Sequence, residues 1–163
     1  MRHVQVSNFQ IPTSDEFATA QSVDPEHKQL LLWIDTKITL STDELAPLSG
    51  HLKCLAQIRE EASLHDGVIA LRRADNSERE LVLVPSALAK RVIRFFYKGP
   101  GGAHQTAKAT SANVIQRFYW PGLKCDVRLY VTCCPTCERI LHLGRNPRAG
   151  LHHMAKGTVS LCS

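Results

Sequence analysis

Apolar residues recur at helical spacing along several stretches of this chain, and two short β-branched runs lie between them. The helical stretches begin at about residues 25, 52, 85, 104 and 123. The first has the signature of a helix start, because Asp24 can cap it and Pro25 suits the first helical position. The last places Leu123, Val127 and Val131 on one face. The pattern therefore predicts a mainly α-helical protein.

The two β-branched runs, 68–71 and 81–84, predict a hairpin, since Asp75-Asn76-Ser77 between them is typical of a turn. Together these elements predict a mainly α fold with a small β-hairpin. We expect a three-helix bundle preceded by a two-stranded extension and one or two N-terminal helices. The expected organisation is a flexible lead-in (1–24), a helical linker region (25–65), the hairpin extension (66–84), a three-helix domain (85–141) and a loose tail (142–163).

Composition narrows the class of protein. The chain has 163 residues, of which 44% are hydrophobic and 21% charged, values that are typical of a folded globular protein. The longest apolar run is five residues, from Leu30 to Ile34, whereas a membrane-spanning helix needs about 20. The first residues have no apolar core of a secretory signal. We expect a nuclear or cytoplasmic protein that is not secreted and makes no membrane contact, in which the six cysteines are reduced thiols or metal ligands.

Charge is divided unevenly between the two halves. Residues 1–80 contain 8 Lys and Arg against 13 Asp and Glu, a balance of −5. Residues 81–163 contain 12 against 2, a balance of +10. A basic half of this kind suits a polyanion such as duplex DNA or another nucleic acid, although a solvated basic surface without a partner has the same composition.

The motif that carries candidate chemistry is Cys134-Pro135-Thr136-Cys137. This spacing lets two thiolates converge on one tetrahedral zinc ion, and it supplies half of a structural site. A redox dithiol has the same spacing, but it belongs at the start of a helix within a βαβ unit. Here the motif follows a predicted helix, which favours zinc over redox chemistry and leaves an inert pair as the remaining alternative.

A longer pattern surrounds this motif. It consists of Leu81-Val82-Leu83-Val84-Pro85, Gly102-Ala103-His104, Lys108 and Thr110, Phe118-Tyr119-Trp120-Pro121-Gly122, Asp126-Val127, Tyr130-Val131 and the two cysteines. In this order and spacing, residues 81–141 resemble the zinc-binding N-terminal domain of gypsy-class retrotransposon integrases, and more distantly that of retroviral integrases. Residues 55–71 resemble, more loosely, the segment that joins RNase H to integrase in such polyproteins.

The resemblance implies a zinc site of two histidines and two cysteines on a three-helix bundle. His104, Cys134 and Cys137 match three of these ligands, but Tyr97 stands where the first histidine belongs. Thr106 likewise replaces a glycine that is common in the family. A phenol has a pKa near 10 and is a poor ligand at neutral pH, so zinc binding is expected to be weak or absent.

Two residues near the motif are conceivable substitutes for the missing ligand. Cys133 points about 100° away from Cys134 if both are helical. His142 has the spacing that ends a zinc knuckle, but a full knuckle is excluded because its last ligand would fall on Pro147. We therefore expect His104, Cys134 and Cys137 to be the metal ligands, with His142 as a less favoured substitute.

Catalytic residues of an integrase are not expected here. Integrases join DNA strands with three carboxylates that hold metal ions, and Glu138 is the one acidic residue after Cys137. The resemblance implies a non-catalytic zinc-binding module that supports nucleic-acid binding, multimerisation, or both, with self-association or an integrase as partner. The alternatives are a protein-interaction module with a decayed metal site and a fragment of a degenerate retroelement. Expected phosphate contacts are Lys90, Arg94, Lys98, Lys108, Arg117 and Lys124.

Overall fold

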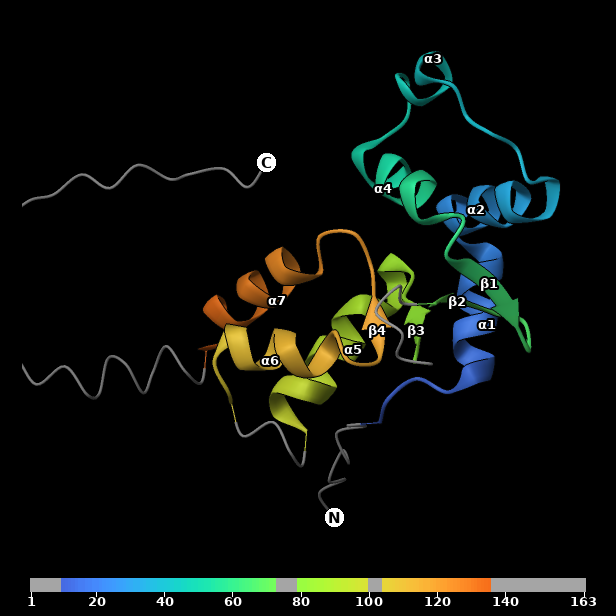
Figure 1. Cartoon of the computed structure of the whole chain (residues 1–163). Coiled ribbons are helices and arrows are strands. Elements are labelled where there is room, and N and C mark those ends of the chain that lie inside the picture. The colour runs from blue at the N-terminus through green and yellow to red at the C-terminus, as the bar shows by residue number, and fades with distance from the viewer. Residues whose placement is uncertain (1–9, 73–78, 100–103, 136–163) are drawn as a thin grey trace, which may run out of the picture.

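The computed structural model describes residues 10–72, 79–99 and 104–135. Its helices are α1 (Ser14–Val23), α2 (Pro25–Thr36), α3 (Thr42–Leu45), α4 (Gly50–Ile58), α5 (Ser86–Lys98), α6 (Ala107–Val114) and α7 (Leu123–Thr132). Its strands are β1 (Ala62–His65), β2 (Val68–Arg72), β3 (Glu80–Leu83) and β4 (Phe118–Tyr119). Figure 1 shows α5, α6 and α7 gathered to one side of the small sheet, α2 and α4 above it, and α1 beside β1 and β2. The expected mainly α fold with a small β element is confirmed.

The N-terminal segment differs from the expected flexible lead-in, because it contains helix α1. Thr13 and Glu16 form a reciprocal capping box at its start, in which each side chain bonds to the other residue's backbone N–H. The helix buries Phe17 and Gln21. With α1, four described helices precede the hairpin, where one or two were expected.

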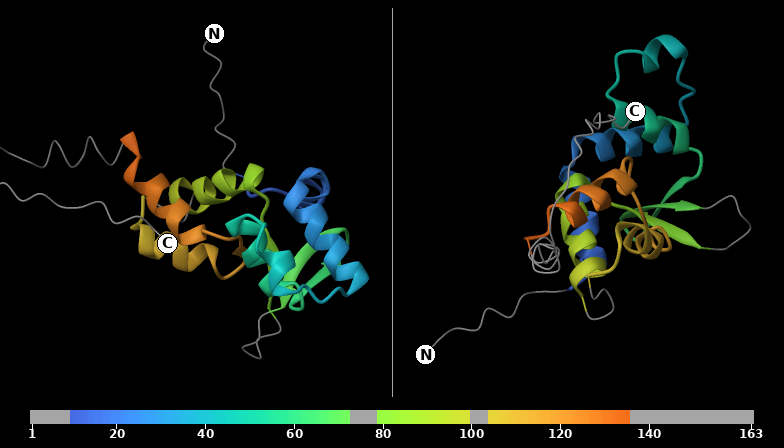
Figure 2. Two further views of the ribbon diagram at one scale, coloured as in Figure 1. Left: turned by 90° about the horizontal axis from the view of Figure 1, so that it is seen from above. Right: turned by 90° about the vertical axis from the view of Figure 1, so that its left-hand side faces the viewer.

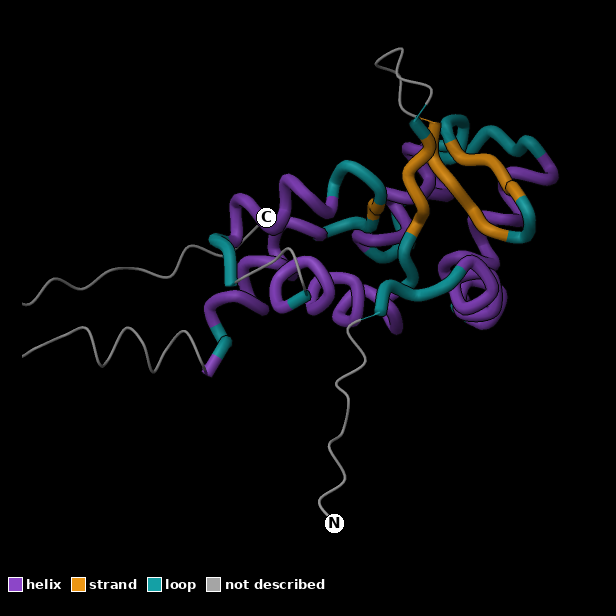
Figure 3. The backbone as a smooth tube through the Cα atoms, turned by 90° about the horizontal axis from the view of Figure 1, so that it is seen from below, coloured by secondary structure: helices purple, strands orange, loops and turns teal. Residues whose placement is uncertain are grey.

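The expected hairpin is present, but it is part of a larger sheet. The order is β1-β2-β3-β4, in which β1 pairs antiparallel with β2 and β2 pairs antiparallel with β3. Strand β4 pairs parallel with β3, placing Val82 opposite Phe118. The linker region expected to be helical up to residue 65 is helical over a shorter range, because α4 stops at Ile58 and β1 begins at Ala62. Figure 3 shows the strands at one end of the molecule, with the bundle helices to one side of them.

Gln21 on α1 holds this helix to the sheet. Its amide nitrogen donates to the carbonyls of Ile69 and Leu83, at 3.3 and 2.6 Å, and its amide oxygen accepts from the Ile69 N–H at 2.7 Å. Strands β2 and β3 are paired only from Ala70 to Arg72, so the Gln21 amide bonds to backbone groups beyond the end of the ladder. Gln21 is 1% exposed. Without its amide, the backbone groups of Ile69 and Leu83 that it contacts would be buried without a hydrogen-bond partner.

Two hydrophobic clusters stabilise the chain. One joins α2 and α4 to the sheet through Leu30, Trp33 and Leu55. The other fills the α5–α6–α7 bundle, and it also contains Phe17 from α1 and Val68 from β2. Figure 2 shows α1 running beside the sheet and close to α5. The bundle therefore shares its core with the N-terminal part of the chain.

The bundle helices begin and end close to their sequence-based expectations. Thr106 caps α6 by accepting from the Ala109 N–H, so α6 starts at Ala107, a little later than expected. Gly122 precedes α7 with a φ of +84°, a conformation that favours glycine. No helix in the described ranges has the length and apolar character that crossing a membrane requires.

We expect Gln21→Leu to destabilise the protein by about 2–5 kcal/mol, since it leaves three buried backbone groups without their partner. Urea unfolding followed by circular dichroism would measure this change. Thr19→Leu on the exposed face of α1 is the matched control, with an expected change within about 0.5 kcal/mol. Equal stability of the two variants would show that the Gln21 bonds do not anchor α1.

Candidate metal centre

His104 lies just before α6 and is held against the end of α5. Its backbone N–H donates to the carbonyl of Tyr97 at 3.0 Å, and its φ of +54° is a left-handed conformation. Gly99 ends α5, and a Cβ added there would lie 2.1 Å from the carbonyl oxygen of Phe95. Glycine at this position therefore lets the chain leave the helix. The His104 backbone hydrogen bond then holds the residue before α6 against the end of α5.

Cys134 follows the end of α7 and faces the interior. Its backbone N–H donates to the carbonyl of Val131, and the residue is 3% exposed, whereas the neighbouring Cys133 is exposed. Cys134 and not Cys133 therefore faces the bundle, which agrees with the different directions expected for the two thiols.

The two candidate ligands from these segments lie side by side. The Sγ atom of Cys134 is 3.8 Å from Nδ1 of His104, although the residues are 30 positions apart in the sequence. Two donors at about 2.0 and 2.3 Å from a tetrahedral zinc ion lie roughly 3.5 Å from each other. The separation of these two atoms fits a shared zinc ion. The other candidate ligands, Cys137 and His142, lie outside the described residues.

Tyr97 fills the place of the fourth ligand with an aromatic ring. It is 0% exposed, and its ring packs edge-on against the His104 ring, with centroids 5.0 Å apart. A second edge-on contact joins it to Tyr130 on α7, at 5.7 Å. Burial is the main cause of the raised pKa of Tyr130. The charge of Arg94 lowers this pKa by a smaller amount, and nearby Cys134 raises it further. At neutral pH the Tyr130 phenol is therefore protonated.

The described residues supply two of the donors that a zinc site needs. Among residues 10–72, 79–99 and 104–135, no three His, Cys, Asp or Glu side chains come close enough to hold a metal ion together. His104 and Cys134 fit zinc in their chemistry and in their separation, and Tyr97 adds a phenol in place of an imidazole. A complete site needs at least one further donor, which Cys137 is placed in the sequence to provide.

Comparison with known proteins relates the segment around this centre to a family. Residues 84–141 match the family model described as the integrase zinc binding domain. This segment is therefore similar to the integrase zinc-binding domain. The resemblance expected from the sequence motifs is thereby confirmed for the second half of the chain.

Three relatives are similar over the same part of the chain. They are the proteins named gypsy retrotransposon integrase-like protein 1 from Macaca fascicularis, Pongo abelii and Homo sapiens. Each is 30% identical over 64 residues, which cover 39% of this chain and 12% of the relative. The similarity thus spans about an eighth of these relatives. No solved structure matches the chain significantly.

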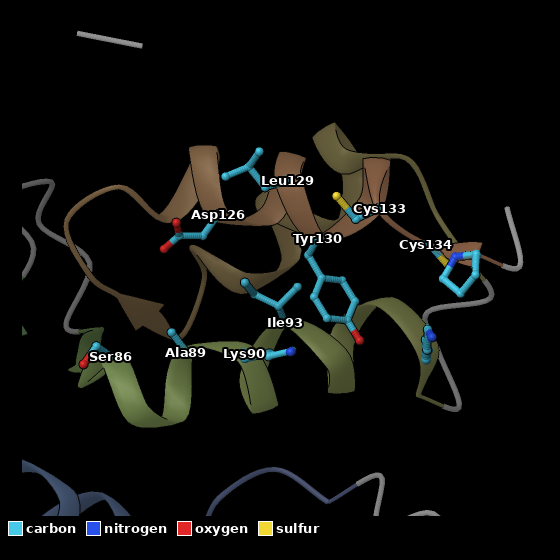
Figure 4. Close-up of a pocket in the computed structure, with 11 residues that line it drawn as sticks. Ser86, Ala89, Lys90, Ile93, Asp126, Leu129, Tyr130, Cys133 and Cys134 are labelled. Carbon is cyan, nitrogen blue, oxygen red and sulfur yellow. The ribbon is translucent and has the colours of Figure 1, made fainter. Parts of the chain in front are cut away.

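Four of the six expected phosphate contacts line two grooves in the segment that matches the family. The first runs between α5 and α7, has a volume of about 500 Å³ and includes Lys90 and Lys98 in its lining. Figure 4 shows Ser86 and Asp126 at one end of this α5–α7 groove and Cys133 and Cys134 at the other. It therefore borders the candidate metal centre.

The second groove lies between α6 and α7 and has a volume of about 470 Å³. Two of the expected phosphate contacts, Lys108 and Lys124, line it together with Arg128. The remaining two, Arg94 on α5 and Arg117 after α6, are exposed and line neither groove. The sequence-based set of six did not include Arg128, although its spacing of four residues from Lys124 places both on one face of a helix.

Proposed function

We propose that this chain is a non-catalytic zinc-binding module of the integrase type, and that it binds nucleic acid through its basic second half. The observation that carries the proposal is the 3.8 Å approach of the Cys134 thiol and the His104 imidazole. The family match over residues 84–141 supports it, because that family is a zinc-binding one.

The proposed zinc ligands are His104, Cys134 and Cys137. Zinc would join the end of α7 to the segment that connects α5 with α6, because His104 and Cys134 come from those two places. A closed four-ligand site contributes on the order of 10–16 kcal/mol to the folding of small metal domains. With Tyr97 in the fourth position the contribution is smaller, and packing supplies a larger share of the stability.

Nucleic-acid binding is proposed from the charge of the domain. Asp126 is the single acidic residue between positions 84 and 135, and its carboxylate accepts a hydrogen bond from the Trp120 indole at 2.8 Å. The lysines and arginines of α5, α6 and α7 therefore produce a positive field, which attracts phosphates without reading base sequence. Self-association or binding to an integrase partner is the second role proposed for the same module.

A protein-interaction module with a decayed metal site is the alternative candidate. The packing of Tyr97 favours it, because this fully buried ring contacts both His104 and Tyr130 and holds the helix ends together without an ion. Zinc content separates the two candidates.

We expect the purified chain to contain about one zinc ion, as measured by elemental analysis. Cys134→Ser removes a thiolate ligand and should release the zinc. Cys133→Ser is the matched control, because it changes an exposed neighbouring thiol, and it should retain the metal. His104→Gln replaces the other proposed ligand, whose side chain is exposed, and it should also release the zinc. A wild-type chain without zinc would reject the zinc site and favour the alternative candidate.

Tyr97→His should restore the family's fourth ligand and make stability depend more strongly on zinc. The expected result is a larger difference in Tm between zinc-loaded and chelator-treated protein than in the wild type, because a ligand that binds the folded state stabilises it. Tyr97→Phe keeps the ring but offers no donor atom, so its difference should not exceed that of the wild type. The same zinc effect in all three proteins would mean that position 97 does not face a metal site.

The affinity of the full chain for a 20-base-pair DNA duplex should fall steeply with salt. If three phosphates are neutralised, raising the salt from 50 to 200 mM weakens binding roughly 40-fold by counterion release. Fluorescence anisotropy at several salt concentrations would measure the slope. Two duplexes of unrelated sequence should bind equally, since phosphate contacts carry no base specificity. Salt-independent binding, or none at micromolar concentrations, would reject nucleic-acid binding.

A further inference from the structure

The groove between α6 and α7 brings together three cations from two helices. Lys108 comes from α6, and Lys124 and Arg128 come from α7. All three side chains are exposed, and none forms an ion pair with another residue in the described ranges. Like charges placed on one surface repel each other, so this arrangement opposes folding unless an anion occupies the groove.

Among the described residues, no acidic side chain lines the α6–α7 groove. Asp126 lies two residues from both Lys124 and Arg128, which is about 200° around an α-helix. Its side chain accordingly faces the α5–α7 groove and accepts the bond from Trp120. The charge of the α6–α7 groove is therefore uncompensated, whereas Lys90 and Lys98 line their groove together with a carboxylate.

Apart from Ile115, the uncharged side chains that line the α6–α7 groove are small. Ala107, Ser111 and Ala112 line it beside the three cations. Small side chains let a charged backbone approach the helices closely, and Ser111 adds a hydroxyl among them. The α5–α7 groove is lined instead by the larger apolar groups Ile93, Leu129 and Tyr130 (Figure 4). Of the two grooves, the one between α6 and α7 suits a phosphate backbone better.

We propose that the α6–α7 groove is the nucleic-acid surface of this chain, with Lys108, Lys124 and Arg128 on the phosphodiester backbone. The inference rests on the proposed nucleic-acid binding and adds where the phosphates lie. Lys90 and Lys98 are then not principal phosphate contacts, and Arg128 joins the set of expected contacts. An arginine can form two parallel hydrogen bonds to one phosphate, which makes it the stronger member of the set.

Two charge-matched variants of the full chain test the surface. Lys124→Gln with Arg128→Gln removes two positive charges from the α6–α7 groove, and Lys90→Gln with Lys98→Gln removes two from the α5–α7 groove. The probe is a 20-base-pair DNA duplex, titrated from 50 to 300 mM salt. Thermal unfolding of each variant checks that the fold is kept. An RNA duplex of the same length serves as a second probe of phosphate recognition.

The α6–α7 variant should bind DNA roughly 30-fold more weakly than the wild type at 0.15 M salt, and its salt slope should fall by about 1.8, as expected for two lost phosphate contacts. The α5–α7 variant should keep a slope close to that of the wild type. Greater loss in the α5–α7 variant, or equal loss in both, would overturn the assignment while leaving nucleic-acid binding intact. Absence of binding by the wild type would instead reject the proposed function itself.

Discussion

The anchoring of α1 to the sheet is the constraint on which the rest of the structure depends. Gln21 fixes this helix over the ends of β2 and β3, and Phe17 then reaches the core of the α5–α6–α7 bundle. The Phe17 ring lies 5.7 Å from that of Phe118, the first residue of β4. Strand β4 also pairs with β3, so backbone hydrogen bonds as well as side-chain packing join the sheet to the α5–α6–α7 bundle. The segment that matches the integrase zinc-binding family therefore shares its core with residues outside that match.

This shared core explains how the candidate metal centre keeps its geometry without a complete set of family ligands. His104 and Cys134 lie at helix ends, where the chain direction is fixed by Gly99, by the backbone bond to Tyr97 and by the last turn of α7. Those helices are held by buried residues such as Val92, Val114 and Val127. Packing thus holds the imidazole and the thiol close to each other in the structure. The Tyr97 ring, which stands where the family has a histidine, adds to this packing.

The sequence could predict the elements whose pattern is local. The bundle helices follow from apolar residues at helical spacing, and the β2–β3 hairpin follows from two β-branched runs with a turn between them. Strand β4 could not be predicted, because two residues carry no period and their partner Val82 is 36 positions away. Helix α1 was missed for a different reason: its anchor is the amide of Gln21, and a polar residue gives no hydrophobic signal. His104 became a candidate ligand through resemblance, since the spacing of 30 residues to Cys134 has no local meaning.

The two grooves on either side of α7 show how one helix can separate two kinds of contact. Lys124 and Arg128 line the groove toward α6, while Asp126 and Tyr130 line the groove toward α5. The net charge of the second half could not reveal this division, because a total charge does not say on which face of a helix the charged side chains lie. The helical period contains it, since residues 124 and 128 share a face that residue 126 does not. The cationic face is the one without buried aromatic groups, so phosphate binding there would leave the Tyr97–Tyr130 packing beside the metal centre undisturbed.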